Sequence, residues 1–447
     1  MYVCVDLGAS STRVATSDRL VHEIPNNVRV IPLNEDTHMT VWDAATYEES
    51  VLNALDVTVM RHEGANQYLE AEQRYLVGTI ADRYGSTVRP NGMEPKHKQV
   101  INYQNAILAI AFEWLMTPQT YSNPGVATPI EVFVALPPIE CKGSEKIFQD
   151  NLKGTYTVQF NSLNTAVTFQ IADVKCKEES LLSLMNFFFN SNGSLRQENI
   201  KYRNGNSLSI DIGASTTDLA VMVNGKYLEK SGFTIPIGGN QIRDFVMNEI
   251  QMAYSFMPQI TEADYVVKTG MLRLGAQEVD FSQQLRRAKE EFAIQLKDRL
   301  NSYFKQIGMS LASFMCITVG GGGSLHSCVG QGDAMNITTP ALSEIIMAEL
   351  HKQCPTVDVI PAPGNPRHAN INGLLVYGLV WEQRAAKQAN QRMIANAQAT
   401  APIMGQPAQP QGNMQGMAQA PNTYAQTTAT AQPNMYVPTG AGQVGPQ

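Results

Sequence analysis

The sequence lacks a hydrophobic run long enough to cross a membrane. Its longest apolar stretch, residues 106–116, is shorter than a spanning helix requires and carries Glu113. No basic segment followed by an apolar core precedes the first apolar strand, so the chain shows no pattern of a secretory leader. We therefore expect a cytosolic protein that is not tethered to a membrane.

Paired cysteines and excess positive charge are also missing. The six cysteines have no C-x-x-C spacing, and several lie in apolar strands, which favours reduced core thiols over disulfides or a zinc site. The formal net charge is −7 over 447 residues, which gives no electrostatic basis for direct nucleic-acid binding. Any association with DNA would have to run through a partner protein.

Charged residues are absent from the end of the chain. Residues 393–447 contain no Asp, Glu, Lys or Arg and are dominated by Gln, Pro, Ala, Gly, Met, Asn and Thr. Such a segment buries too little apolar surface to offset the entropy of ordering, so we predict a disordered tail. It is interpreted either as a plain spacer or as a bundling segment that uses Tyr424 and Tyr436.

The rest of the chain, within an overall hydrophobic content of 43%, is long enough for two domains or one large bilobal unit. Apolar periodicity and turn residues locate its main elements. We predict strands at 24–31, 76–80, 130–136, 156–160, 166–171, 219–223 and 315–319, and helices at 99–116, 180–190, 241–252 and 282–303. The pair Asn224-Gly225 indicates a type I′ turn.

One short pattern occurs twice in the sequence. An apolar strand leads into an aspartate, then a small-residue turn rich in hydroxyls, then a second apolar strand; the copies are VDLGASST at 5–12 and IDIGASTTD at 210–218. Glycine and alanine let the backbone approach a charged oxygen, and turn amides and hydroxyls donate hydrogen bonds to it. The carboxylate at the strand end can hold a hydrated cation. Two such hairpins predict two halves that clamp a phosphate.

Two glycine-rich segments in the second half suit the same kind of ligand. The strand at 315–319 runs into four glycines, 320–323, which allow the backbone to approach a flat base or a ribose. Gly238 and Gly239 precede a predicted helix, whose free N-terminal amides favour anions.

In their order along the chain, these motifs resemble those of the actin-like ATPase superfamily and, within it, the bacterial ParM-type filament proteins. The resemblance spans roughly residues 1–390, and residues 370–378 are similar to the second connecting helix of that family. It implies a bilobal α/β fold of two duplicated ribonuclease-H-like domains that face a nucleotide cleft. The first would cover 1–205, with a small insertion at about 34–100 and completion by about 365–392, and the second would cover 206–364.

The resemblance also implies ATP and Mg²⁺ as ligands and assigns residues to them. Asp6 and Asp211 would hold Mg²⁺ through its waters, and Asp211 would act in catalysis together with Glu179, which orients the attacking water and has Glu178 beside it. Lys289 and Glu290 would contact the ribose and the adenine. The other nucleotide-binding residues it implies are Gly8, Ala9, Ser10, Ser11, Thr12, Arg13, Gly213, Ala214, Ser215, Thr216, Thr217, Gly238, Gly239, Gly320, Gly321, Gly322, Gly323 and Ser324.

One position departs from the pattern of this family. Many actin-like sequences carry a lysine at the end of the first hairpin, where this chain has Arg13. The positive charge is kept, but a guanidinium group presents a planar fork of donors in place of a point charge. The phosphate contacts of the first hairpin are therefore expected to differ in detail.

Three functions fit this superfamily. The first is a cytoskeletal ATPase that assembles with itself into dynamic filaments and moves DNA, such as a plasmid, through a DNA-bound adaptor. The second is a small-molecule, sugar-type kinase, and the third is a chaperone or reactivating ATPase. A chaperone should carry a folded substrate domain after the ATPase core, where this chain has only the uncharged tail. We favour the filament protein and keep the kinase as the alternative.

Overall fold

The computed structural model describes residues 2–17, 20–37, 51–52, 55–64, 71–92, 94–116, 128–228, 232–325 and 340–400. Residues up to Asn390 form one compact unit, and the described residues from Gln391 to Thr400 do not belong to it. Helix α10 (Ala369–Thr400) continues past Arg392, whereas the rest of the predicted tail, 401–447, lies outside the described residues. None of the helices in the described ranges is long and apolar enough to cross a membrane.

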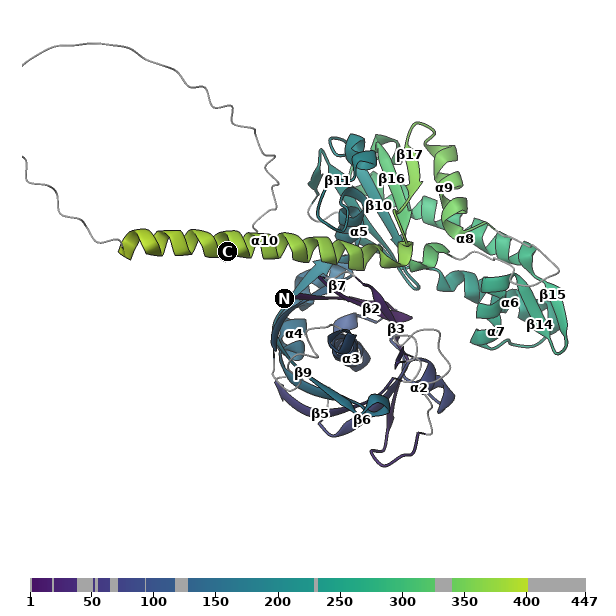
Figure 1. Cartoon of the computed structure of the whole chain (residues 1–447). Coiled ribbons are helices and arrows are strands. Elements are labelled where there is room, and N and C mark those ends of the chain that lie inside the picture. The colour runs from purple at the N-terminus through teal and green to yellow at the C-terminus, as the bar shows by residue number, and fades with distance from the viewer. Residues whose placement is uncertain are drawn as a thin grey trace, which may run out of the picture. The chain divides into compact units, whose positions relative to one another are not determined.

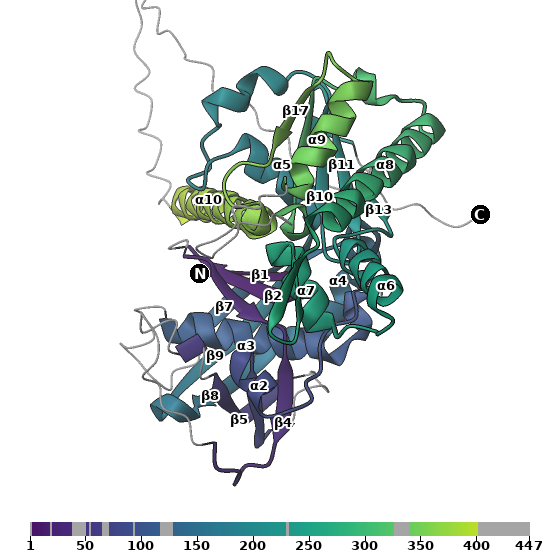
Figure 2. The same cartoon turned by 90° about the vertical axis from the view of Figure 1, so that its right-hand side faces the viewer.

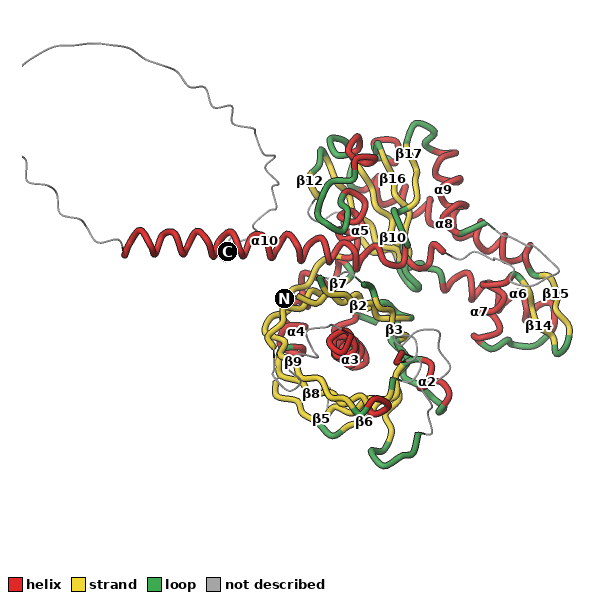
Figure 3. The backbone as a smooth tube through the Cα atoms, in the orientation of Figure 1, coloured by secondary structure: helices red, strands yellow, loops and turns green. Residues whose placement is uncertain are grey.

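A mixed sheet of nine strands contains the first hairpin (Figure 1). Its order is β3-β2-β1-β7-β9-β8-β5-β6-β4, where the strands are β1 (Tyr2–Leu7), β2 (Ser11–Thr16), β3 (His22–Pro25), β4 (Val28–Ile31), β5 (Asp56–Gly64), β6 (Gln73–Val77), β7 (Thr128–Leu136), β8 (Gly154–Phe160) and β9 (Thr165–Glu178). The sheet curls around helix α3 (Val100–Met116), as Figures 1 and 3 show. Because α3 is apolar on nearly every face, it can be buried almost completely.

A second sheet of six strands contains the second hairpin. Its order is β12-β11-β10-β16-β17, with β13 also on β11, and the strands are β10 (Ser207–Ile212), β11 (Thr217–Val223), β12 (Lys226–Tyr227), β13 (Phe233–Ile235), β16 (Cys316–Gly320) and β17 (Asp358–Pro361). Helices α6 (Asn240–Tyr254), α7 (Ile260–Thr269), α8 (Ser282–Gln306) and α9 (Leu342–Gln353) contribute to its core (Figure 2). β14 (Met271–Leu274) pairs with β15 (Gln277–Asp280) (Figure 1). The hairpins therefore lie in separate sheets.

Helix α5 (Glu179–Phe188) packs against both sheets and against α10. Its Leu182 joins a core cluster with Phe133 of β7 and Leu374 of α10, while its Phe187 joins a cluster with β11 and β16. The two helices touch closely, because a Cβ on Gly373 of α10 would overlap the carbonyl of Leu182. This glycine, found in the sequence at the start of the predicted connecting helix, has a packing role.

Two predicted strands are corrected by the structure. The strand predicted at 24–31 is divided into β3 and β4, which lie at opposite ends of the nine-stranded sheet. Asn26 ends the first part, because its amide donates to the carbonyl of Ser10 and its side chain to that of Gly8. The strand predicted at 76–80 is wrong after Val77, since helix α2 (Thr79–Arg83) begins there after Gly78 at φ 74°.

The other predicted elements are found at or near their predicted positions. Helices α3, α5, α6 and α8 and strands β7, β8, β11 and β16 correspond to predictions, and β9 is longer than predicted. The Asn224-Gly225 turn has the positive φ angles, 50° and 73°, of a type I′ turn. Helix α4 (Pro138–Leu152), which begins at a proline, was not predicted. The division into domains at 205 and 206 stays a prediction.

Candidate nucleotide site

The two hairpins have the same backbone design. β1 pairs with β2 and β10 with β11, both antiparallel, and each turn starts with a glycine. The amide of Gly8 donates to the carbonyl of Ser11 over 3.1 Å, and the amide of Gly213 to the carbonyl of Thr216 over 2.8 Å. A Cβ on Gly8 or Gly213 would lie 2.7 Å or 3.0 Å from that carbonyl oxygen. The repeated sequence pattern is therefore a repeated turn in space.

The strand-end carboxylates differ in the residue that lies opposite them. Asp6 is opposite Arg13 across the first hairpin, whereas Asp211 is opposite Asp218 across the second. All four side chains are buried. The first hairpin thus places a cation beside its acid, while the second brings two acids together.

Arg13 is held by several partners of the first sheet. Its Nη1 donates to Asp6 over 3.0 Å, and its Nη2 donates to Ser11 over 3.2 Å and to Glu23 over 3.4 Å. Burial would lower the pKa of Arg13, but the carboxylates of Asp6 and Glu23 raise it above its ordinary value. His368 and then Arg13 lower the pKa of Glu23 to about 2 against the opposing effect of burial. The guanidinium therefore stays charged inside the protein.

Asp211 is hydrogen-bonded to the start of helix α10. Asn370, in the first turn of α10, donates a 2.8 Å hydrogen bond from Nδ2 to Oδ2 of Asp211. Burial raises the pKa of Asp211 to about 7, and the charges of Asp218 and Asp6 act in the same direction. A cation bound beside Asp211 would offset this cost of ionisation.

The glycine run packs by its backbone against the second hairpin. β16 is parallel to β10 and places Gly320 beside Asp211. Gly321 has φ 89°, and a Cβ on it would overlap Oδ1 of Asp211, while a Cβ on Gly323 would overlap the carbonyl of Gly213. Only residues without side chains allow an approach this close.

Two arginines flank the middle of this run. A Cβ on Gly322 would lie 3.9 Å from Nη2 of Arg13 and 3.7 Å from Cγ of Arg367. Arg367 belongs to η7 (Pro366–His368), and no sequence motif singled it out. Ser324, in η6 (Gly322–Leu325), is buried and donates a 2.6 Å hydrogen bond to the carbonyl of Gly321, which closes the glycine turn.

The amides that follow Gly238 are used by the second hairpin. The amide of Gly239 donates to the carbonyl of Gly213 over 3.0 Å, and that of Asn240 to the carbonyl of Ala214 over 2.7 Å. A Cβ on Gly238 would lie 2.6 Å from the Ala214 oxygen. The expectation of free amides at the start of α6 is therefore wrong for these two, which fix the hairpin turn.

Glu179 is the first residue of α5 and forms an ion pair with Lys96 of η1 (Lys96–Lys98). Burial raises the pKa of Glu179 to about 8, an effect that Lys96 opposes and Asp218 strengthens. The neighbouring Glu178 accepts a hydrogen bond from Tyr227. Lys96 was not predicted as a site residue, because nothing in the local sequence marks it and only the fold brings it to Glu179.

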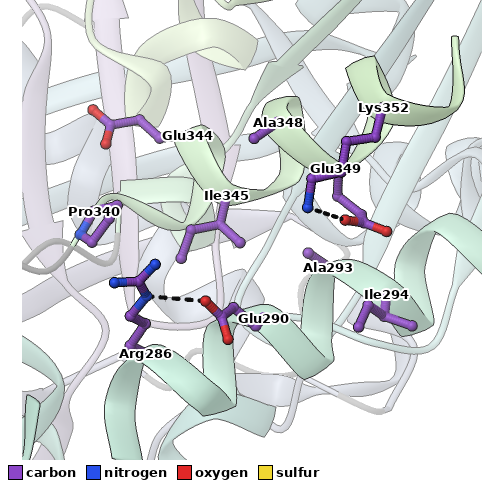
Figure 4. A pocket seen from close by; sticks show the side chains of 10 residues that line it. All are labelled: Arg286, Glu290, Ala293, Ile294, Pro340, Glu344, Ile345, Ala348, Glu349 and Lys352. Carbon is purple, nitrogen blue, oxygen red and sulfur yellow. Dashed lines mark hydrogen bonds and ion pairs between the residues drawn. The ribbon is translucent and has the colours of Figure 1, made fainter. Parts of the chain in front are cut away.

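Lys289 and Glu290 are adjacent in α8, but the side chain of Lys289 is buried and that of Glu290 lines a cavity. Lys289 is fully buried and donates a 2.9 Å hydrogen bond to the carbonyl of Pro340. Glu290 lines a cavity of about 470 Å³ between α8 and α9, where it pairs with Arg286 over 3.0 Å beside Ile345 (Figure 4). Of the two, Glu290 is placed to reach a ligand in that cavity.

Comparisons with known proteins concern the fold of the chain. Residues 209–327 match the family model "Archaeal actin homologue MreB-like, C-terminal". The solved structure of the actin-like protein Alp7A matches with a TM-score of 0.64 and 17% identity over 88% of this chain and 99% of that one. A 15-stranded ParM filament from Clostridium botulinum matches with a TM-score of 0.61 and 16% identity over 84% and 99%. Bacillus thuringiensis ParM with ATP matches with a TM-score of 0.56 and 14% identity over 86% and 98%.

A search of curated proteins gives no match. The structural matches show that the chain has the actin-like fold, and they confirm the resemblance that the paired hairpins predict.

Proposed function

We propose that the chain binds ATP with Mg²⁺ at the two hairpins, hydrolyses it, and assembles with copies of itself into filaments. The observation that carries this proposal is the second hairpin, where the buried acids Asp211 and Asp218 lie opposite each other and Asp211 also lies against the glycine run. The likeness in fold to a ParM structure with ATP and to a ParM filament supports it.

In this proposal the turns of both hairpins bind the β- and γ-phosphates through amides and hydroxyls. We assign the glycines 320–323 and Glu290 to the adenosine, although the cavity that Glu290 lines is formed by α8, α9 and Pro340 and not by the glycine run. Arg367, beside Gly322, adds a second guanidinium near the nucleotide.

The acids of the hairpins fit a hydrated magnesium ion. Within the described ranges, no group of three or more His, Cys, Asp or Glu side chains is arranged to hold a metal directly. Mg²⁺ keeps several of its waters, and Asp211 would hold it through them. Asp6, which is already paired with Arg13, would add a second carboxylate. When bound, the ion would neutralise charge on the phosphates.

Hydrolysis requires a water in line with the bond between the γ-phosphorus and the bridging oxygen of ADP. Glu179 accepts a hydrogen bond from this water and takes its proton as the new phosphorus–oxygen bond forms and the bridging bond breaks. Burial raises the pKa of Glu179, which makes its carboxylate a stronger base for the proton of this water. Phosphate and ADP are the products.

We further propose that the filaments move DNA in the cytoplasm through a DNA-bound adaptor, as a plasmid-partition system does. The net charge of −7 disfavours direct contact with DNA and leaves that contact to the adaptor.

The test is light scattering with negative-stain microscopy on the full chain with Mg²⁺ and ATP, ADP or no nucleotide, together with phosphate release. We expect filaments with ATP. Asp211→Ala should release no phosphate above background, whereas Asp298→Ala, at an exposed position of α8, should match the wild type. A monomer that hydrolyses ATP only when a small substrate is added would contradict the filament proposal and favour a kinase.

A further inference from the structure

The residues before α3 lie against both hairpin turns. A Cβ on Gly92 would overlap Oγ of Ser215 and lie 3.5 Å from Cβ of Ala9, so this backbone meets one turn from each sheet. Gln99 holds it there, because its side chain accepts from the amide of Asn91 over 2.7 Å and donates to the carbonyl of Asn91 over 2.9 Å. The backbone at Asn91 and Gly92, within the predicted insertion, therefore lines the site beside both hairpin turns.

Lys96 follows this backbone segment and is the first residue of η1. Asn102 of α3 donates a 3.1 Å hydrogen bond to the carbonyl of Lys96, and Tyr103 donates one of 2.7 Å to the carbonyl of His97. These bonds fix the backbone of η1 to α3. The Lys96 side chain is 17% exposed and ends at the carboxylate of Glu179.

Arg13, the cation that the sequence places at the phosphates, is already neutralised. Its two terminal nitrogens are hydrogen-bonded to Asp6, Ser11 and Glu23, two of which are carboxylates. Lys96 pairs instead with Glu179, the residue proposed to bind the attacking water. Arg13 and Lys96 therefore differ in how readily they can exchange their partners for a ligand.

We propose that Lys96 binds the terminal phosphate of ATP, and that it exchanges its ion pair with Glu179 for this contact and so frees Glu179 for the attacking water. This inference rests on the proposed ATP site. A terminal phosphate carries more negative charge than one carboxylate and offers several oxygens to the three donors of an ammonium group. ADP lacks that phosphate and leaves the pair intact, so Lys96 makes the site distinguish ATP from ADP.

The experiment compares Lys96→Met with Lys98→Met by calorimetric titration of the full chain with ATP and with ADP in the presence of Mg²⁺. Lys98 is a matched control, because it belongs to the same short helix but is exposed. Lys96→Met should weaken ATP binding by about tenfold or more, as expected for loss of a charge-assisted contact, while ADP binding stays within about twofold. Lys98→Met should leave both affinities unchanged.

A second variant keeps the test valid if Lys96→Met folds poorly. Glu179→Gln releases Lys96, so it should bind ATP several-fold more tightly than the wild type while hydrolysing it more slowly. The gain should shrink in the Lys96→Met background, since the effect acts through Lys96.

The possible failures are distinct. An unchanged ratio of ATP to ADP affinity in Lys96→Met, with normal wild-type binding, would overturn the role of Lys96 alone. A wild-type chain that binds neither nucleotide would overturn the proposed function and this inference with it.

Discussion

Arg13 lies directly opposite Asp6 in the first hairpin and donates a 3.0 Å hydrogen bond to its carboxylate. The corresponding place in the second hairpin, opposite Asp211, is occupied by Asp218. The two copies of one sequence pattern therefore differ in the charge of the residue that faces the strand-end aspartate. The first is neutralised within its own sheet, whereas the second is acidic and suits a bound cation.

Arg13 should be more important for stability than its charge alone suggests. Arg13→Ala leaves the buried carboxylate of Asp6 without its cation, and we expect the free energy of unfolding to fall by about 3–5 kcal/mol. Arg13→Lys keeps the charge but loses the fork of donors to Ser11 and Glu23, and should cost about 1–2 kcal/mol. Urea unfolding followed by circular dichroism measures both. Equal losses would contradict the role of the fork.

Asp211→Asn should stabilise the nucleotide-free protein although it removes a catalytic group. The folded state holds the pKa of Asp211 at about 7, above the ordinary 3.8, so ionisation costs stability as pH rises through this interval. The substitution should therefore raise the unfolding free energy by on the order of 1 kcal/mol or more at pH 8, and by less at pH 5. Thermal melts at the two pH values provide the measurement. A gain of the same size at both would argue against a buried, ionised Asp211.

Glu23 should contribute to stability with the opposite pH dependence. Its pKa is lowered to about 2 from 4.5, so its contribution is present above pH 4.5 and is lost as pH falls toward 2. Because the side chain is partly exposed, Glu23→Gln should cost about 1 kcal/mol at pH 7. The difference between wild type and variant, measured by urea unfolding, should shrink at pH 3. A constant difference would assign the effect to packing.

Gly321→Ala should disrupt the site more than an alanine at another glycine of positive φ. Gly321 and Gly364 have φ angles of 89° and 74°, but only at Gly321 would a Cβ meet neighbouring atoms, including Asp211. Gly364→Ala should cost about 1 kcal/mol through backbone conformation alone. Gly321→Ala should cost more and abolish ATP binding, as unfolding curves and titration would show. Similar costs at the two positions would rule out the close approach to Asp211.

The local features of the chain could be predicted from its sequence. The helix α3, the strand β7 and the Asn224-Gly225 turn follow from apolar periodicity and from residues that accept positive φ. The division of 24–31 into two strands could not be predicted in this way. It depends on hydrogen bonds from Asn26 to Gly8 and Ser10, which lie in the turn between β1 and β2. Arg367 carries no local signal for the same reason, since only packing brings it to Gly322.

The sequence by itself determined the two hairpin turns and the residues at their strand ends, because a tight turn depends on a few adjacent residues whose chemistry can be read directly. Only the tertiary structure decided which residues meet those turns. Lys96 reaches Glu179 across 83 positions, and Asn370 reaches Asp211 across 159. Such pairs depend on how α5 and α10 pack in the folded chain, and a local pattern carries no record of that packing.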